Sequence, residues 1–386
     1  MFWFSQQKPE DKPVTGLVLP GGGARNAYQV GVLKAIAEML PEGSSNPFPV
    51  ITGTSSGAVN AAIVASMADD YHKSTAQLES IWLDLSVGSI FYADTFTALT
   101  SGLRWLLTLV TAGLGPASPK SVLDNQPLRN LLDEQLDLGN IQTAIDNGQL
   151  RALGISASSY QSGRSICYYQ GSDDIIPWER SQRFGLPCIL RVDHLMASIA
   201  IPLIFPAIKI NGEYHGDGTM RESAPLSPAL HLGANRLLII GIQDRPGIET
   251  GNKYPSVGQI SGYVLDTLFM DSLNADIERL NRINLTLTKT KEKRVDMADT
   301  TLRPVEFLVV SPSIDLSSMV EKHVKSAPVA VRALLRGMGA LNREGRPLIS
   351  YLLFESGFSQ ELIELGYQDG LKNREEILKL LEPEKE

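Results

Sequence analysis

The pentapeptide Gly53-Thr54-Ser55-Ser56-Gly57 places a serine in the Gly-x-Ser-x-Gly pattern. This pattern is typical of a sharp turn between a strand and a helix, which leaves the serine hydroxyl exposed to a substrate. Gly53 and Gly57 then occupy positions where a Cβ atom would clash. The pattern alone also fits a glycine-rich helix start capped by Thr54 or Ser56, so its meaning depends on the neighbouring elements. Ser55 is the candidate nucleophile.

Three consecutive glycines, Gly21-Gly22-Gly23, form a second motif and are followed by Ala24 and Arg25. Such a loop leaves backbone N–H groups uncovered, and these can hold a phosphate or the oxyanion formed during acyl transfer. Neither a Gly-x-Gly-x-x-Gly spacing nor a Gly-Lys-Ser/Thr sequence is present, which disfavours nucleotide binding. Since the candidate nucleophile follows about thirty residues later, an oxyanion hole is the favoured interpretation.

A serine hydroxyl must lose its proton to attack an ester, so a base is required. The chain has five histidines, and His231 would complete the order Ser55, Asp217, His231 of an α/β-hydrolase triad. His231 falls in a segment predicted as a helix, however, where a solvated structural histidine is the simpler interpretation. Asp217 is the stronger candidate, because it ends a predicted hairpin strand and Gly218 lets its carboxylate approach another loop.

The elements around these motifs alternate between strand and helix. Residues 14–19 form a short apolar run that leads into the glycine loop, and the apolar spacing predicts a helix over 27–40. A second strand is predicted at 48–51 and a second helix at 58–68. Strand, glycine turn and helix thus occur twice within the first 70 residues, which predicts an α/β sheet covered on both faces.

The rest of the chain predicts more elements of the same sheet. Further strands are expected at 152–157, 165–169, 237–242 and 307–310, with a helix over 123–136. Asn211-Gly212 between two alternating segments predicts a hairpin. The pattern after Ser311 is helical. Because no internal repeat or linker occurs, we expect one domain over residues 14–370 and a helical tail over 371–386.

Composition excludes several classes of protein. The chain has 386 residues, 43% of them hydrophobic and 20% charged, which is typical of a globular protein. A net charge of −8 argues against a nucleic-acid partner. Cys167 and Cys188 are too few for a disulfide framework, and we expect both as buried free thiols. The first residues lack the pattern of a secretory signal, so a cytoplasmic protein is expected.

Residues 94–119 form an apolar segment, predicted as helical, in which Arg104 is the single charged residue after Asp94. Its strongly apolar part is shorter than the roughly 20 residues that a bilayer-spanning helix needs. One interpretation is a pair of helices packed over the sheet. The other is an interfacial flap over 96–114 in which Trp105 contacts lipid, making the protein a peripheral membrane protein.

Taken in order, these motifs resemble the patatin-like phospholipase family. The resemblance rests on Gly21-Gly22-Gly23-Ala24-Arg25, Gly53-Thr54-Ser55-Ser56-Gly57 and Asp217-Gly218. The block from Ala197 to Pro202, followed by Phe205-Pro206, also looks like the segment that this family carries between its serine and aspartate motifs. The similarity runs from about Val14 to about Asp369, which is nearly the whole chain.

The resemblance implies a three-layer α/β/α sandwich with a largely parallel central sheet. Ser55 would attack the ester carbonyl, Asp217 would take its proton without a histidine, and the N–H groups of Gly21, Gly22 and Gly23 would hold the oxyanion. Arg25, Gly53, Gly57 and Gly218 would support these groups. The resemblance implies no metal and no cofactor.

The substrate implied is a phospholipid or another acyl-ester lipid. An acyltransferase or a hydrolase of soluble esters on the same two residues is an alternative, as is a catalytically silent lipid-binding protein. Three residues depart from the family pattern: Pro20 before the glycines, Asn26 where many bacterial members have glycine, and Thr219 after Asp217-Gly218. None of them removes a reacting group, so the departures bear on loop shape and substrate preference.

Overall fold

The computed structural model describes residues 13–92, 121, 123–242, 254–292, 302–326 and 329–382. The apolar segment predicted over 94–119, with its proposed lipid contact over 96–114, lies outside these residues. Within the described ranges, no helix combines the length and the apolar character needed to cross a bilayer.

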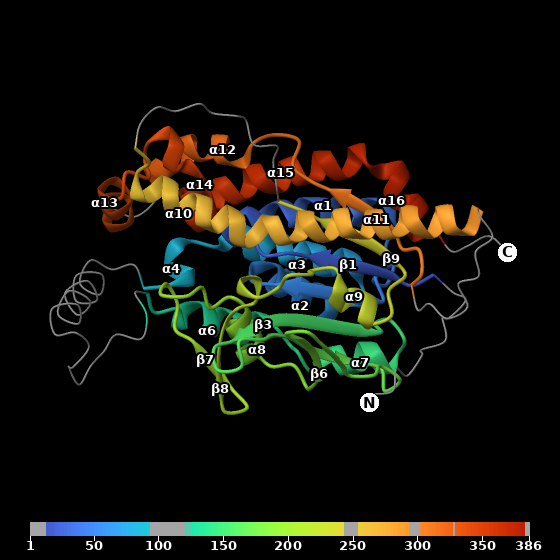
Figure 1. Ribbon diagram of the computed structural model, residues 1–386. Helices are drawn as coiled ribbons and strands as arrows, with labels where there is room; N and C mark the ends of the chain where they lie inside the picture. Colours follow the sequence, from blue (N-terminus) through green and yellow to red (C-terminus); the bar gives the residue numbers. More distant parts are fainter. Residues whose placement is uncertain are drawn as a thin grey trace.

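A mixed sheet forms the centre of the structure (Figure 1). Its strands are β1 (Thr15–Leu19), β2 (Val50–Thr54), β3 (Ala152–Ser159), β4 (Ser165–Gly171), β5 (Trp178–Arg180), β6 (Arg183–Pro187), β7 (Ile208–Ile210), β8 (Glu213–Asp217), β9 (Arg236–Ile240) and β10 (Glu306–Val310). The order is β10-β9-β1-β2-β3-β4-β6-β5, and every pairing from β10 to β3 is parallel. β8 pairs antiparallel with β3, which brings Asp217 opposite Ala157.

Helices cover both faces of this sheet (Figure 1). They are α1 (Ala27–Met39), α2 (Ser56–Ser66), α3 (Tyr71–Asp84), α4 (Val87–Ile90), α6 (Gln126–Gln135), α7 (Asn140–Asp146), α8 (Val192–Ser198), α9 (Ser227–His231), α10 (Val257–Asp266), α11 (Ser272–Glu292), α12 (Leu316–His323), α13 (Val329–Gly337), α14 (Arg346–Leu352), α15 (Ser356–Lys372) and α16 (Arg374–Leu381). Short 3-10 turns η1 (Gly23–Asn26) and η2 (Gly218–Met220) follow β1 and β8, and a π-helical turn, η3 (Thr267–Asp271), joins α10 to α11.

Because side chains alternate between the two faces of a sheet, the residues of β1 and β2 that contact each helix show that α2 and α9 lie on opposite faces of the sheet. A Cβ on Gly16 would lie 3.6 Å from the Cβ of Ala229 in α9, whereas one on Gly53 would lie 2.6 Å from the Cα of Ala58 in α2. Gly16 pairs with Val50, three residues before Gly53, and side chains alternate along a strand. The three-layer α/β/α arrangement with a largely parallel sheet is therefore confirmed.

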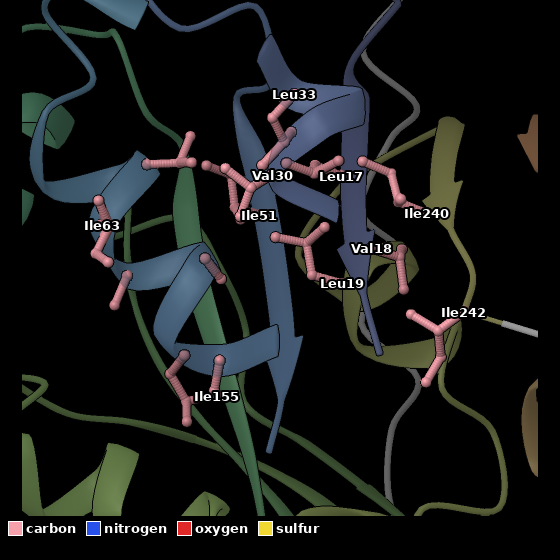
Figure 2. Packing of buried hydrophobic residues seen from close by; sticks show 14 of the residues in the cluster. Leu17, Val18, Leu19, Val30, Leu33, Ile51, Ile63, Ile155, Ile240 and Ile242 are labelled. Carbon is pink, nitrogen blue, oxygen red and sulfur yellow. The ribbon is translucent and has the colours of Figure 1, made fainter. Parts of the chain in front are cut away.

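The core between β1, β2 and α1 is largely apolar, as is typical of a parallel sheet covered on both faces. Leu17, Leu19 and Ile51 of the two strands are fully buried together with Val30 and Leu33 of α1 (Figure 2). This packing fixes the ends of β1 and β2, from which the glycine loop and the Ser55 turn extend.

Most predicted elements are present, with shifted bounds. β2 begins at Val50 rather than Phe48, because Pro49 has no N–H to donate to a sheet; its carbonyl instead accepts from the N–H groups of Arg151 and Ala152. The Asn211-Gly212 hairpin forms, with φ of 50° and 90° at the two residues. Cys167 is buried as predicted, whereas Cys188 is only half-buried, so that part of the prediction is wrong.

Candidate active site

Ser55 occupies the turn between β2 and α2, in a backbone conformation that few residues other than glycine adopt. Its φ is 53° and its ψ is −133°, so the residue is strained. A Cβ on Gly57 would lie 2.2 Å from the carbonyl oxygen of Leu19, and one on Gly53 would lie 2.5 Å from that of Gly57. Gly57 is therefore needed for the close approach of the turn to the end of β1, and Gly53 for that of α2 to β2.

Asp217 ends β8 and lies directly beside Ser55. The Oγ of Ser55 donates a hydrogen bond of 2.7 Å to Oδ2 of Asp217, although 162 residues separate the two in the sequence. The other carboxylate oxygen, Oδ1, accepts from the N–H of Thr219 at 3.0 Å and from its hydroxyl at 2.7 Å. Ser55 is 2% exposed and Asp217 is 1% exposed, so the pair is shielded from bulk water.

Burial makes Asp217 a stronger base than an ordinary aspartate. Loss of hydration raises its pKa from 3.8 to about 6, while the hydrogen bonds from Ser55 and Thr219 act in the opposite direction and keep the rise moderate. The carboxylate is therefore ionised near neutral pH and able to accept a proton there.

A further serine fixes the backbone of the nucleophile turn. The N–H of Ser55 donates to Oγ of Ser198 at 2.8 Å, and that hydroxyl donates to the carbonyl oxygen of Ser156 at 2.6 Å. Ser198 ends α8 and was not singled out by the sequence analysis. The signal was present, since Ser198 lies in the Ala197 to Pro202 block on which the family resemblance partly rests.

The glycine loop after β1 lies against the Ser55 turn. A Cβ on Gly21 would lie 2.8 Å from the Cβ of Ser55. One on Gly23, whose φ is 54°, would lie 2.2 Å from the carbonyl oxygen of Tyr351. Gly22 and Gly23 begin the 3-10 turn η1, and among the described residues their N–H groups meet no acceptor. These N–H groups are therefore available for an oxyanion beside Ser55.

Arg25 ties the glycine loop to helices from the C-terminal half of the chain. Its guanidinium donates to Ser350 at 2.8 Å, to the Tyr351 hydroxyl at 3.0 Å and to Asp266 at 3.2 Å. Arg25 is 3% exposed and also lies over the ring of Tyr351. Phe269 of the π-helical turn contacts the same ring and packs against Gly21. Arg25 thus connects the glycine loop to α10 and α14.

Two of the residues that depart from the family pattern make hydrogen bonds in the site. The side-chain amide of Asn26 donates to the carbonyl oxygen of Pro20 at 2.9 Å and to the hydroxyl of Ser56 at 2.8 Å. It thereby joins the glycine loop to the start of α2. Thr219 supplies the hydroxyl that bonds Asp217.

An apolar pocket opens onto Ser55. The space between its walls, open solvent included, is about 760 Å³. Its apolar walls come from α2, α3, α6, α14 and the segments around them: Val59, Ile63, Ile81, Trp82, Leu85, Ile90, Leu128, Leu131, Leu132, Leu136, Ile199, Ile201, Phe205, Tyr351, Leu352 and Phe354.

A second hollow continues from this pocket between α3, α4 and α6. The two share Ile81, Leu85, Leu131 and Gln135. Its remaining lining residues are polar: Gln77, Ser80, Asp84 and Ser89. The polar residues of this second hollow form a polar rim beside the apolar pocket.

His231 lies away from the Ser55–Asp217 pair. Its ring stacks on Trp178 with 4.7 Å between centroids and an interplanar angle of 12°. Burial, together with Arg180 and Arg183, lowers its pKa to about 4. His231 is half-buried rather than solvated, so that expectation was wrong. All five histidines fall in the described ranges, and none of them is a hydrogen-bond partner of Ser55 or Asp217.

The described part of the chain contains no group of three or more histidine, cysteine, aspartate or glutamate side chains arranged to hold a metal ion. Acyl transfer by a serine, a carboxylate base and backbone N–H donors needs no such group. Ser55, Asp217 and the glycine loop supply the groups that such a transfer would use.

Comparison with known proteins gives a consistent result. The model of the patatin-like phospholipase family matches residues 17–230, which include the glycine loop, Ser55 and Asp217. Over 86 residues the chain is 41% identical to lysophospholipase nte1 of Aspergillus terreus, and to the same degree to lysophospholipase nte1 of Aspergillus niger. Each match covers 20% of this chain and 5% of the relative, so the match spans about a twentieth of the length of these curated relatives.

Proposed function

This chain belongs to the patatin-like phospholipase family, and from that premise we propose that it is a serine acyl hydrolase that cleaves fatty-acyl esters of membrane lipids. The observation that carries the proposal is the 2.7 Å hydrogen bond from Ser55 to Asp217 beside an apolar pocket. A carboxylate in this position can take the serine proton directly, without a histidine.

The proposed reaction has two halves. In the first, Ser55 Oγ attacks the ester carbonyl carbon while its proton passes to Oδ2 of Asp217, and the N–H groups of the glycine loop hold the oxyanion. The proton then moves to the departing alcohol as the carbon–oxygen bond breaks, which leaves an acyl group on Ser55. In the second half, Asp217 takes a proton from water, the resulting hydroxide attacks the acyl carbon, and the fatty acid leaves as Ser55 regains a proton.

The apolar pocket favours a substrate with a long acyl chain, which the pocket would bind. Its apolar walls would bury methylene groups, each contributing about 0.8 kcal/mol. The headgroup, on the other side of the ester bond, would lie outside the apolar pocket, and the polar rim would face water. A phospholipid or lysophospholipid fits this arrangement, as does another ester with a long chain.

Fatty-acid release from phosphatidylcholine vesicles and from a short soluble ester tests the proposal. We expect activity in the wild type and none in Ser55→Ala. Ser66→Ala is the matched control, because Ser66 is a buried serine whose hydroxyl bonds the carbonyl of Ile63 at the far end of α2. Equal activity of wild type and Ser55→Ala would overturn the assignment.

The same assay separates the alternatives. Product transfer to an added alcohol in preference to water would indicate an acyltransferase, and activity confined to the short ester would indicate a soluble-ester hydrolase. A folded wild type without turnover on either substrate, with vesicle binding that Ser55→Ala leaves unchanged, would indicate a silent lipid-binding protein. The proposed contact of residues 96–114 with a membrane surface is tested by vesicle co-sedimentation of Trp105→Ser, for which weaker binding is expected.

A further inference from the structure

Glu222 is a buried acid to which the proposed reaction gives no role. It follows the turn η2, five residues after Asp217, and is 6% exposed. Within the described ranges, no lysine or arginine forms an ion pair with it. Burial of a carboxylate without a cation opposes folding. A buried acid next to a candidate active site is itself a candidate for a role in the chemistry of that site.

Both carboxylate oxygens of Glu222 are bonded to residues that hold the nucleophile. The hydroxyl of Thr54, the residue before Ser55, donates to Oε2 at 2.7 Å. The hydroxyl of Ser156 donates to Oε1 at 2.5 Å. Ser156 is also the residue whose carbonyl fixes Ser198, and Ser198 accepts the N–H of Ser55. Glu222 thus bridges the end of β2 to β3 directly under the strained turn.

The residue that follows Asp217 packs against the same two residues, Thr54 and Ser156. A Cβ on Gly218 would lie 2.4 Å from the carbonyl oxygen of Ser156 and 2.7 Å from Cγ2 of Thr54. Asp217, immediately before Gly218, is therefore close enough to Glu222 for the two charges to interact. Burial raises the pKa of Glu222 to about 7, and repulsion from Asp217 contributes. The other ionisable groups that face Glu222 are Asp276 of α11 and the thiol of Cys167 in β4, and neither is a cation.

We infer that Glu222 is a positioning residue that acts through the Ser55–Asp217 dyad, fixing the nucleophile turn and strengthening the base by its negative charge. The inference rests on the proposed function. During attack, the proton moves from Ser55 Oγ to Oδ2 of Asp217, and the negative charge moves from Asp217 to the oxyanion at the glycine loop. A charged Glu222 repels the charge on Asp217 and so favours this transfer. Because the repulsion is mutual, the two carboxyls titrate as a coupled pair.

The test is the pH dependence of kcat/KM on a short soluble ester between pH 4.5 and pH 9, as compared in wild type and Glu222→Gln. If both carboxylates must be ionised, the wild-type rate falls about a hundredfold per pH unit at the acidic end of the profile. In Glu222→Gln one ionisation remains, so the rate falls about tenfold per pH unit and the midpoint moves to lower pH.

Two further variants give a shift of the opposite sign. Thr54→Val and Ser156→Ala each remove a hydrogen bond that lowers the pKa of Glu222 but leave its charge in place. In both variants the acidic limb should move to higher pH and keep its steep slope. Glu222→Asp, which retains the charge, should also keep the steep slope. A purely structural role would lower activity in these variants without opposite shifts of the profile.

An acidic limb in Glu222→Gln with the wild-type slope and midpoint would overturn the inference. If Glu222→Gln does not fold, the test is the shift of the acidic limb to higher pH in Thr54→Val. The absence of that shift would also overturn the inference. Ser55→Ala separates this failure from failure of the proposed function. Turnover that persists in Ser55→Ala would refute the proposed dyad itself. An inactive Ser55→Ala together with an unchanged pH profile in Glu222→Gln would refute only the role of Glu222.

Discussion

Replacement of Asp217 by asparagine is expected to abolish turnover and to stabilise the folded chain above about pH 6. The asparagine side chain is nearly the same size and can still accept from Thr219 through its oxygen, while its amide can donate to the hydroxyl of Ser55. It cannot accept the proton of Ser55, however, so the attack on the ester loses its base. The stability gain follows from removal of a buried charge.

The magnitude follows from the difference between the folded and unfolded pKa of Asp217. Burial raises the folded value to about 6 from the 3.8 of an exposed aspartate. Because the folded pKa is the higher one, the wild type has its full stability below the unfolded pKa and loses part of it as the pH rises through about 6. Two units at about 1.4 kcal/mol each correspond to a loss of about 3 kcal/mol. The variant has no carboxyl to ionise and avoids this loss.

Thermal unfolding at pH 4 and at pH 8 measures the effect. For a chain of this length, unfolding entropy of about 2.1 cal/mol/K per residue converts about 3 kcal/mol into a shift in Tm of about 4 °C. We expect that gain in Asp217→Asn at pH 8 and almost none at pH 4. Asp173→Asn, at an exposed aspartate, is the control and should shift Tm at neither pH. A variant no more stable than wild type at pH 8 would refute the argument that Asp217 is a strained, desolvated base.

Three further substitutions test separate parts of the site. Thr219→Val removes the 2.7 Å hydrogen bond to Asp217 and so raises the pKa of that carboxyl; the acidic limb of the rate profile should move to higher pH. Leu131→Trp puts a larger side chain into the wall that the apolar pocket shares with the polar rim, and it should lower hydrolysis of long-chain esters at least several-fold relative to a short ester. His231→Ala loses its stacking on Trp178, worth about 1 kcal/mol, yet should keep most of its turnover; an inactive variant would instead restore the serine–histidine–aspartate triad.

The fold around the nucleophile was predictable because its signals are local. The apolar runs of β1 and β2, the glycines that follow them and the helical periodicity of α1 all lie within the first 70 residues. The shifted start of β2 depends on Pro49, whose missing N–H is itself a local property. The hairpin before Asp217 was equally visible, because Asn211-Gly212 supplies the two positive φ values that its turn requires.

The groups that support the site could not be predicted in this way, because they depend on strand order. Ser156 lies next to the Ser55 turn because β3 pairs with β2, and Asp217 reaches the turn because β8 pairs with β3. Apolar periodicity predicts that these strands exist but carries no information about which of them are neighbours. The contacts of Arg25 with Asp266 and Tyr351 are even harder to predict from the sequence, since they join residues more than 240 positions apart.

The departures from the family pattern carry a physical consequence that the sequence alone did not reveal. A glycine in place of Asn26 or Thr219 would supply no side-chain hydrogen bond, whereas here the two side chains bond Pro20, Ser56 and the base itself. Each such bond contributes about 1 kcal/mol, and more where the acceptor is charged. The two bonds of Asn26 join the glycine loop to the start of α2, and the bond of Thr219 holds a buried carboxylate. The glycine loop and Asp217 thus have side-chain bonds that glycine at these positions would not supply, and these bonds would keep the donors of the proposed oxyanion hole oriented before the substrate arrives.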